Sequence, residues 1–357
     1  MADWSQPFES AYRFVRVSRA TGYETGEIDA IRGGSLVINR DTDTYESANV
    51  DTATVLDVGA DLVRCYLDAT FGDGSTESVC LGTWLPSVPS RDVDGAFVTS
   101  NAYLDGRLAE LQDDSFEAAY TLPAGTNIVG AAAAIVTGAG LPVRVVASNA
   151  TLGAPWVFGL EDEGEEDGGT KLQAVNALMR LAGYAAAHTD EWGTVVLEPS
   201  QTVAGNDPVW TFREGLGATF LAKAEDERDT RDVANVVLAI YETEGQTTIG
   251  TAEDDDPESP YSTVTLGRRK VVKYRYNDTA TQARANQKAA ELLETNQSVI
   301  RRVTLSHVHN PARVGDVVSV DWPSAGISGA FIIRTQTVEI GSAGCLTTSE
   351  LRRYERR

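Results

Sequence analysis

The stretch "GTKLQAVNALMRLAGYAAAHTDEWGTVVLEP", residues 169–199, predicts a helix followed by a tight hairpin. Thr170 and Gln173 have the spacing of a capping box, in which each side chain bonds the other residue's backbone N–H. Apolar residues then recur at helical spacing as far as Gly183, which is placed to end the helix. The polar residues of Asp190–Gly193 predict a turn between two short strands. The stretch therefore indicates a small α/β unit.

The residues before this unit are dominated by strand patterns. Between residues 12 and about 100, short alternating segments, including "ATVLDV" at 53–58, are separated by Gly, Asp and Ser clusters. Such spacing is typical of an antiparallel barrel or sandwich. The clearest hairpin is "FGDGSTES", residues 71–78, with Asp73 and Gly74 at its tip.

Two further helices are expected between the strands and the hairpin unit. Apolar residues at helical spacing predict one over residues 102–112. "TNIVGAAAAIVTGAG", residues 126–140, predicts another, with Thr126 or Asn127 as its cap. The middle of the chain is thus mixed α/β.

Strand patterns return in the last part of the chain. One helix interrupts them, "ATQARANQKAAELLET" at residues 280–295, with Asp278 or Thr279 as its cap. "GTAEDDDPESP", residues 250–260, predicts a mobile loop, and the chain closes in a polar tail ending in "LRRYERR", residues 351–357.

These patterns predict an α+β chain that is mostly β and has three parts. Residues 1–101 form a β-rich domain, residues 102–205 an α/β domain with helices and a hairpin, and residues 206–357 a second β-rich domain with a helix inserted at about 279–295. A chain of 357 residues is long for one hydrophobic core, which agrees with several domains.

Composition favours a protein made in the cytoplasm. The sequence has no apolar run of eighteen residues, so we expect no membrane-spanning helix. The opening "MADWSQPFES" lacks the basic and apolar regions of a signal peptide. Cys65, Cys80 and Cys345 have no metal-ligand spacing and are expected to be buried free thiols, although a Cys65–Cys80 pair stays open.

The charge is strongly negative and unevenly distributed. The net charge is −22, and residues 1–120 carry 21 acidic against 8 basic side chains. Such a surface repels nucleic-acid phosphates and offers no patch that would bind them.

Two of the three histidines lie in "VTLSHVHNPARVGDVVSVDW", residues 303–322. In a strand, His307 and His309 would share one face, as a zinc site requires, with Asp316 or Asp321 as a nearby third ligand. The third histidine, His188, lies in another section of the chain. A metal-dependent hydrolase is therefore one alternative.

A simpler interpretation makes the same residues the end of a strand. Asn310 and Pro311 end the strand, Gly315 and Asp316 form the next turn, and "VVSVDW" is the returning strand. The histidines then lie where a polar tip can reach water. Because no second metal motif accompanies them, we predict no metal site here.

Other candidate sites have little support in the sequence. The acidic runs Glu161–Asp167 and Asp254–Glu258 lack the order of a calcium loop and are expected to be solvated. No nucleophile motif and no phosphate-binding glycine motif is present. Six tryptophans are dispersed along the chain. We therefore predict no catalytic, cofactor-binding or metal-binding residue and no cofactor.

The order of segments resembles the tail hub and baseplate hub proteins of bacteriophages, including the N-terminal hub module of siphophage tail-associated lysins. The resemblance rests on "GEIDAIRGGSLVINRDTDTYESANVDT" (26–52), on the section from "YLDGRLAELQ" (103–112) to the hairpin unit, and on "NPARVGDVVSVDW" (310–322). The "LAGY" helix end followed by "DEWG" is the most specific feature, and the order spans nearly the whole chain.

The resemblance implies two tube-like antiparallel β-barrels flanking the small α/β domain. It implies a homotrimeric ring that continues the tail tube at the tail tip of a virion. The implied partners are the distal tail or tail tube protein, tail-tip or fibre proteins and the tape measure protein. Genome DNA would pass through the channel without specific binding, which an anionic lumen favours.

The resemblance also implies a structural protein and not an enzyme, since the chain has about the length of a hub module alone. Two alternatives remain: the hydrolase with His307 and His309, and a monomeric surface-binding module that contacts polysaccharide through exposed tryptophans.

Overall fold

The structure is a computed structural model that describes residues 3–94, 97–158, 169–201, 203, 206–229, 233–243, 246–276, 280–296, 299–341 and 345–355. Strands account for 49% of the described residues and helices for 15%, which confirms a mostly β protein. The chain divides into two compact units. Unit 1 contains Met1–Lys223 and Leu305–Leu351, and unit 2 contains Ala224–Thr304 and Arg352–Arg357.

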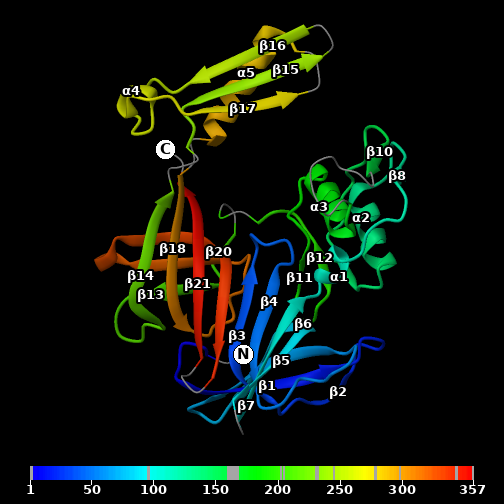
Figure 1. The fold of residues 1–357 in the computed structure, drawn as a ribbon. Helices are drawn as coiled ribbons and strands as arrows, with labels where there is room; N and C mark the ends of the chain where they lie inside the picture. The colour runs from blue at the N-terminus through cyan, green and yellow to red at the C-terminus, as the bar shows by residue number, and fades with distance from the viewer. Residues whose placement is uncertain are drawn as a thin grey trace. The chain divides into compact units, whose positions relative to one another are not determined.

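The elements follow one another from β1 to β21 (Figure 1). The strands of the first third are β1 (Phe8–Val17), β2 (Glu24–Glu27), β3 (Ile31–Asn39), β4 (Glu46–Thr52), β5 (Leu62–Phe71), β6 (Thr76–Asp94) and β7 (Phe97–Gly106). The mixed section contains α1 (Ala109–Gln112), β8 (Tyr120–Leu122), α2 (Ile128–Gly138), β9 (Val143–Val145), β10 (Trp156–Phe158), α3 (Lys171–Leu181), β11 (His188–Thr189) and β12 (Val195–Leu197).

The last part of the chain returns to strands. It contains β13 (Trp210–Arg213), β14 (Phe220–Asp229), β15 (Val236–Thr243), β16 (Gln246–Glu253), α4 (Thr263–Leu266), β17 (Val271–Tyr276), α5 (Gln282–Asn296), β18 (Val299–Val308), β19 (Val317–Trp322), the 3-10 helix η1 (Pro323–Ala325), β20 (Ile327–Ile340) and β21 (Leu346–Glu355).

One large sheet joins the N-terminal and C-terminal strands. Its order is β14-β18-β21-β20-β3-β4-β7-β6-β5-β1-β2, with β19 also pairing with β20 and β13 with β19. The two halves meet where β20 and β3 pair antiparallel, from Thr335 opposite Asn39 to Ile340 opposite Gly34. The described strands show no closed barrel, so the two-barrel arrangement stays a prediction.

The main core lies under this junction. Leu36 of β3 and Val50 of β4 are buried together with Val338 and Ile340 of β20. Trp84 in β6 is fully buried in the same cluster. Residues from both ends of the sequence thus share one apolar core, which ties the two halves of the sheet together.

The small α/β section folds much as its sequence predicts. Asn127 caps α2 by accepting from Gly130 N, and Thr170 caps α3 in a complete capping box with Gln173. The strands β11 and β12 form the predicted hairpin, in which Asp190 N donates to Thr194 O. On its other side β12 pairs parallel with β9.

Unit 2 is a three-stranded sheet with one helix along it. The central strand β15 pairs antiparallel with β16 and parallel with β17, and α5 packs on β15 and β16 (Figure 1). Its core contains Ala239, Tyr241, Ala285 and Ala289. The approach of α5 needs glycine at position 250, where a Cβ would lie 2.0 Å from the Ala285 carbonyl oxygen.

Three sequence predictions about elements were wrong. The predicted helix over 102–112 is a strand as far as Gly106, because β7 pairs with both β4 and β6, and only Ala109–Gln112 is helical. Residues 53–58 form no strand; Leu56 instead fills the main core from a loop.

The third wrong prediction is the polar tail at the end of the chain. Leu346–Glu355 instead forms β21, and Leu351 is buried. In addition, residues 250–253 of the predicted loop belong to β16. The proposed caps Asp278 and Thr279 and the acidic run Glu161–Asp167 lie outside the described residues.

The three-part division stays a prediction, and its first boundary, at residue 101, falls inside β7. The inserted helix spans Gln282–Asn296. Among the described residues, none of the helices is both long enough and apolar enough to span a bilayer.

Gly34 is the residue at which the junction tolerates no side chain. Its φ is +133°, and a Cβ would lie 2.1 Å from Asn49 O. We expect Gly34→Ala to lower the free energy of unfolding by about 3 kcal/mol or more, because backbone atoms on two strands must move. Urea unfolding measures this loss.

Gly26→Ala is the matched control, because an added Cβ in β2 meets no atom within 4 Å. It should change the unfolding free energy by no more than about 0.5 kcal/mol. Equal losses for the two variants would show that the close packing at the junction is not what restricts position 34.

Candidate functional site

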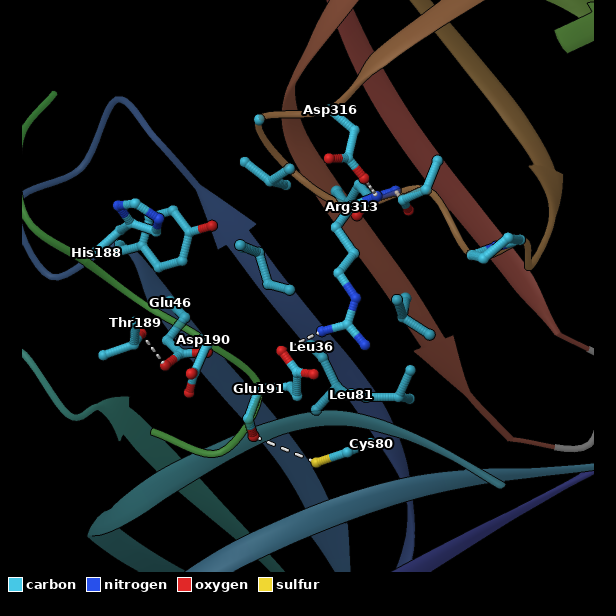
Figure 2. Close-up of a pocket in the computed structure, with 18 of the residues that line it drawn as sticks. Leu36, Glu46, Cys80, Leu81, His188, Thr189, Asp190, Glu191, Arg313 and Asp316 are labelled. Atoms are coloured by element: carbon cyan, nitrogen blue, oxygen red, sulfur yellow. Dashed lines mark hydrogen bonds and ion pairs between the residues drawn. The ribbon is translucent and has the colours of Figure 1, made fainter. Parts of the chain in front are cut away.

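A cavity of about 420 Å³ lies inside unit 1. Its walls are the β11–β12 hairpin, strands of the large sheet and the loop between β18 and β19 (Figure 2). The hairpin contributes His188 and Glu191, β4 contributes Glu46, and the loop contributes Arg313 and Asp316. Three parts of the chain that are distant in sequence therefore meet around one polar space.

Arg313 connects the loop to the hairpin. Its guanidinium forms an ion pair with Glu191 at 2.5 Å. The loop is held in shape by Asp316, whose carboxylate accepts from Arg313 N at 2.8 Å. Burial raises the pKa of Asp316, while the backbone hydrogen bond from Arg313 lowers it. The predicted turn at Gly315 and Asp316 is confirmed, and it positions a charged side chain across the cavity.

On the hairpin side, His188 lies between a cation and an anion. His188 Nε2 is 3.3 Å from the Arg40 guanidinium and 3.4 Å from Glu198 Oε1. The hydrogen bond from His188, helped by the charge of Arg40, lowers the pKa of Glu198 against the opposing effect of burial. His188 Nδ1 and Arg40 Nε are both buried without a partner.

Glu46 is a buried carboxyl at the base of the cavity. It accepts a hydrogen bond from the Thr189 hydroxyl. Burial raises the pKa of Glu46 to about 8, and the nearby Asp190 carboxylate adds to the rise. The side chain is therefore mostly protonated at neutral pH. The sequence analysis missed this residue; the alternation in β4, which places Glu46 on the same face as the buried Ala48 and Val50, is the signal that could have found it.

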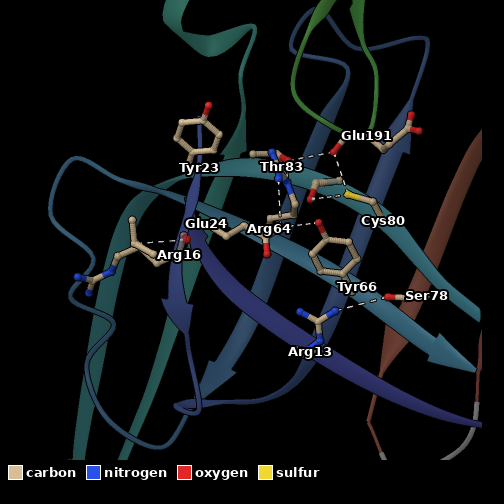
Figure 3. Close-up of polar contacts among 12 residues, drawn as sticks. Arg13, Arg16, Tyr23, Glu24, Arg64, Tyr66, Ser78, Cys80, Thr83 and Glu191 are labelled. Atoms are coloured by element: carbon tan, nitrogen blue, oxygen red, sulfur yellow. Dashed lines mark hydrogen bonds and ion pairs between the residues drawn. The ribbon is translucent and has the colours of Figure 1, made fainter. Parts of the chain in front are cut away.

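The tip of the hairpin is held by a second polar cluster (Figure 3). Thr83 and Cys80 of β6 both donate to the Glu191 carbonyl, at 2.9 and 3.2 Å. The Arg64 guanidinium donates to Thr83 at 2.9 Å and lies over the Trp192 ring at 4.8 Å. A cation over an indole face is attracted by the ring's electrons. The hairpin is thus clamped to the N-terminal sheet.

Glu24 of β2 completes this cluster. It pairs with Arg64 at 3.3 Å and accepts from the Tyr66 hydroxyl at 2.5 Å. The Arg13 guanidinium covers the Tyr66 ring at 4.6 Å. Arg64 is almost fully buried, so its charge needs the Glu24 carboxylate beside it.

The two histidines at the end of β18 are buried. His307 Nε2 is 2.8 Å from Ser349 Oγ, and its Nδ1 is 2.7 Å from the Val308 carbonyl. Burial lowers the pKa of His307 to about 4. Both ring nitrogens are already used in protein hydrogen bonds, so His307 is a structural residue of the strand end.

His309 packs edge-to-face on Trp4, with ring centroids 5.4 Å apart. Its Nε2 is buried without a partner, and burial lowers its pKa to about 3. The expectation that the histidine tips reach water was therefore wrong, because the N-terminal segment and β21 cover them. The expected strand end is confirmed, since β18 stops at Val308.

The structure does not bring together the residues considered as alternative metal ligands. Asp316 is in its turn, and Asp321 is half exposed and paired with Arg213 at 3.5 Å. Within the described part of the chain, no group of three or more His, Cys, Asp or Glu side chains is arranged to hold a metal ion.

The cysteines and tryptophans, the remaining candidates for a functional site, are mostly buried in the fold. Cys65, Cys80 and Cys345 are buried free thiols, as expected. Trp4, Trp84 and Trp322 are buried, and Trp156 and Trp210 are partly buried. The half-exposed Trp192 is covered on one face by Arg64. The described tryptophans therefore form no exposed stacking platform.

Glu46 generates a prediction about pH. Its pKa is 4.5 in the unfolded chain and about 8 when folded, so its contribution to stability is complete below pH 4.5 and is lost as the pH rises to 8. This loss is roughly 1 kcal/mol per pH unit. Glu46→Gln keeps an acceptor for Thr189 and removes the titration.

We therefore expect the unfolding free energy of Glu46→Gln to rise relative to the original protein between pH 4.5 and 8. Urea unfolding at several pH values measures the difference. Glu27→Gln, which changes an exposed carboxyl of β2, controls for the loss of one negative charge. Parallel pH curves for Glu46→Gln and the original protein would contradict the assignment.

His309 gives the opposite pH dependence. Its pKa falls from 6.5 in the unfolded chain to about 3 when folded, so its contribution is present above pH 6.5 and is lost as the pH falls toward 3. His309→Phe keeps the ring contact with Trp4 without the titrating nitrogen. The variant should gain roughly 1 kcal/mol per pH unit over the original protein in this range. Acid unfolding followed by circular dichroism tests this, and identical acid limbs would refute it.

No known protein family and no curated protein matches the sequence. Solved structures do match over nearly the full length. A tail protein from Neisseria meningitidis MC58 superimposes with a TM-score of 0.66 at 15% identity, covering 96% of this chain and 97% of its own. The 43 kDa tail protein of a Shewanella oneidensis prophage gives 0.65 at 13% identity, covering 97% and 98%.

A prophage tail protein from Listeria monocytogenes EGD-e gives a TM-score of 0.54 at 13% identity, covering 95% of this chain and 94% of its own. The alignments extend over both units and include the α/β section as well as the two groups of strands. This chain has the fold of phage tail proteins.

Proposed function

We propose that this chain is a structural virion protein, a tail hub that forms a trimeric ring at the distal end of a phage tail tube. The observation that carries the proposal is the full-length match with a tail protein, which covers 96% of this chain and 97% of the other. A match of single modules would support only a shared domain. Here the whole succession of strands, α/β section and strands is shared.

The β3–β20 ladder supports a ring. It already places two groups of strands edge to edge within one chain, and three copies would supply six such groups. The path of the sheet leaves β2 and β14 at its ends. An edge strand offers unpaired N–H and C=O groups to another chain, so in the proposed ring these ends would lie at the contacts between copies. In this proposal residues 1–101 and 206–357 provide two tube-like barrels, and residues 102–205 lie outside the tube.

The acidic character supports a channel for DNA. The net charge is −22, and residues 1–120 hold 21 acidic side chains. An anionic lumen repels phosphates, so the genome passes without binding. The ring would join the distal tail or tail tube protein to tail-tip or fibre proteins, with the tape measure protein as a further neighbour.

A structural role fits the histidines better than the hydrolase alternative does. Both ring nitrogens of His307 are hydrogen-bonded within the protein, and His309 is buried against Trp4. A metal could bind this pair only after the strand end had been dismantled.

Light scattering over a concentration series tests the proposal. We expect a mass near three times 38.2 kDa, and ring-shaped particles with a central channel in negative-stain images. Metal analysis of the same peak separates the alternatives. A monomer with one zinc would favour the hydrolase, and a metal-free monomer at every concentration would favour the surface-binding module.

A further inference from the structure

The neighbouring strands β20, β3, β4 and β7 turn one face away from the main core. Side chains alternate along each strand, so Leu36, Val50, Leu104 and Val338 are buried and the positions between them are partly or fully exposed. Strand pairing places three such positions from each strand, twelve in all, on one continuous surface, the junction face. They are Thr335, Thr337 and Glu339 of β20, Ser35, Val37 and Asn39 of β3, Ser47, Asn49 and Asp51 of β4, and Asn101, Tyr103 and Asp105 of β7.

The junction face contains no lysine or arginine. Three of its twelve residues are acidic, seven are Ser, Thr or Asn, and the other two are Val and Tyr. Arginines flank it in sequence: Arg334 pairs with Asp41 at 2.6 Å, and Arg32 lies at the bulge of β3. Other strands of the large sheet do carry exposed cations, such as Lys223 in β14. The face therefore offers no cation to a phosphate.

The α/β section contacts the other side of the same strands. Thr189 of the β11–β12 hairpin donates to Glu46, which points in the same direction as the buried Val50 of β4. Leu36 and Val338, which also point to the core, line the cavity next to the hairpin. Because successive side chains of a strand point to opposite faces, the hairpin lies on the side opposite to the junction face.

We infer that the junction face lines the channel through which the genome passes. The inference rests on the proposed function, in which residues 102–205 lie outside the tube, so that the opposite side of these strands faces inward. The charge of the face agrees independently with this placement. Its carboxylates repel phosphates and its short polar side chains form no ion pair with them, so DNA would move along the face without being held.

The β3–β20 ladder runs through this face, so the lining continues across the junction between the two groups of strands. One chain would thus contribute an unbroken acidic and polar strip to the channel wall. Cations would lie only outside the strip.

Gold labelling of assembled rings, followed by negative-stain imaging, tests the placement. Asn49→Cys in β4 and Thr337→Cys in β20 each put one thiol on the junction face, on opposite sides of β3. The three original cysteines are buried, so they react little with a maleimide. We expect maleimide-coupled gold in both variants to lie within the central hole. Ala134→Cys, at an exposed position of α2, is the matched control, and its gold should lie at the outer rim.

Gold at the outer rim in either junction-face variant would overturn the inference and leave the proposed ring intact. Thiols that the maleimide does not reach, or loss of rings in these two variants while Ala134→Cys assembles, would also overturn it, because the face would then be covered by another copy. Absence of rings from the original protein would instead contradict the proposed function on which the inference rests.

Discussion

The antiparallel ladder between β3 and β20 is the interaction on which the rest of unit 1 depends. It pairs residues from 296 positions apart, Thr335 and Asn39, to 306 positions apart, Ile340 and Gly34, and Thr335 Oγ1 also bonds the Asn39 side chain. The main core forms beneath it from both ends of the chain. Closing so long a loop costs entropy before any contact is gained. The ladder must therefore form together with the burial of Leu36, Val338 and Ile340, which supplies the compensating free energy.

The sequence predicted the elements whose signals are local. The capping box at Thr170, the Asn127 cap and the turn at Asp73 and Gly74 are set by side chains a few residues apart, and all three are found. The helix predicted over 102–112 was wrong because Leu104, Leu108 and Leu111 fit a helical period. Pairing of β7 with strands on both sides holds the segment extended as far as Gly106. Tertiary pairing overrides local preference in such cases.

The candidate site was harder to predict because it has no local signal. The hairpin prediction located His188 and Asp190 correctly, but nothing nearby in sequence indicates that Arg313 or Glu46 would join them. The sequence analysis missed Glu46, and only the two-residue alternation of β4 could have indicated that it is buried. The histidines at the strand end drew attention by their spacing, yet their surroundings come from Trp4 and Ser349, at opposite ends of the chain. Spacing within a strand shows which side chains share a face and does not show what covers that face.

The hairpin tip explains why buried charges are kept in this structure. A single ladder leaves two groups of strands free to bend about it, because adjacent strands tolerate a range of twist. The Glu191 carboxylate forms an ion pair with Arg313 of the C-terminal half. The Glu191 carbonyl accepts hydrogen bonds from Thr83 and Cys80 of the N-terminal half. Glu191 therefore bridges both sides of the ladder. Apolar residues at these positions could also be buried, but their contacts would not fix one angle between the two groups of strands. The hydrogen bonds in this clamp are directional and therefore favour one angle. The clamp therefore fixes the angle between the two groups of strands, at the cost of the modest stability lost by burying the charges.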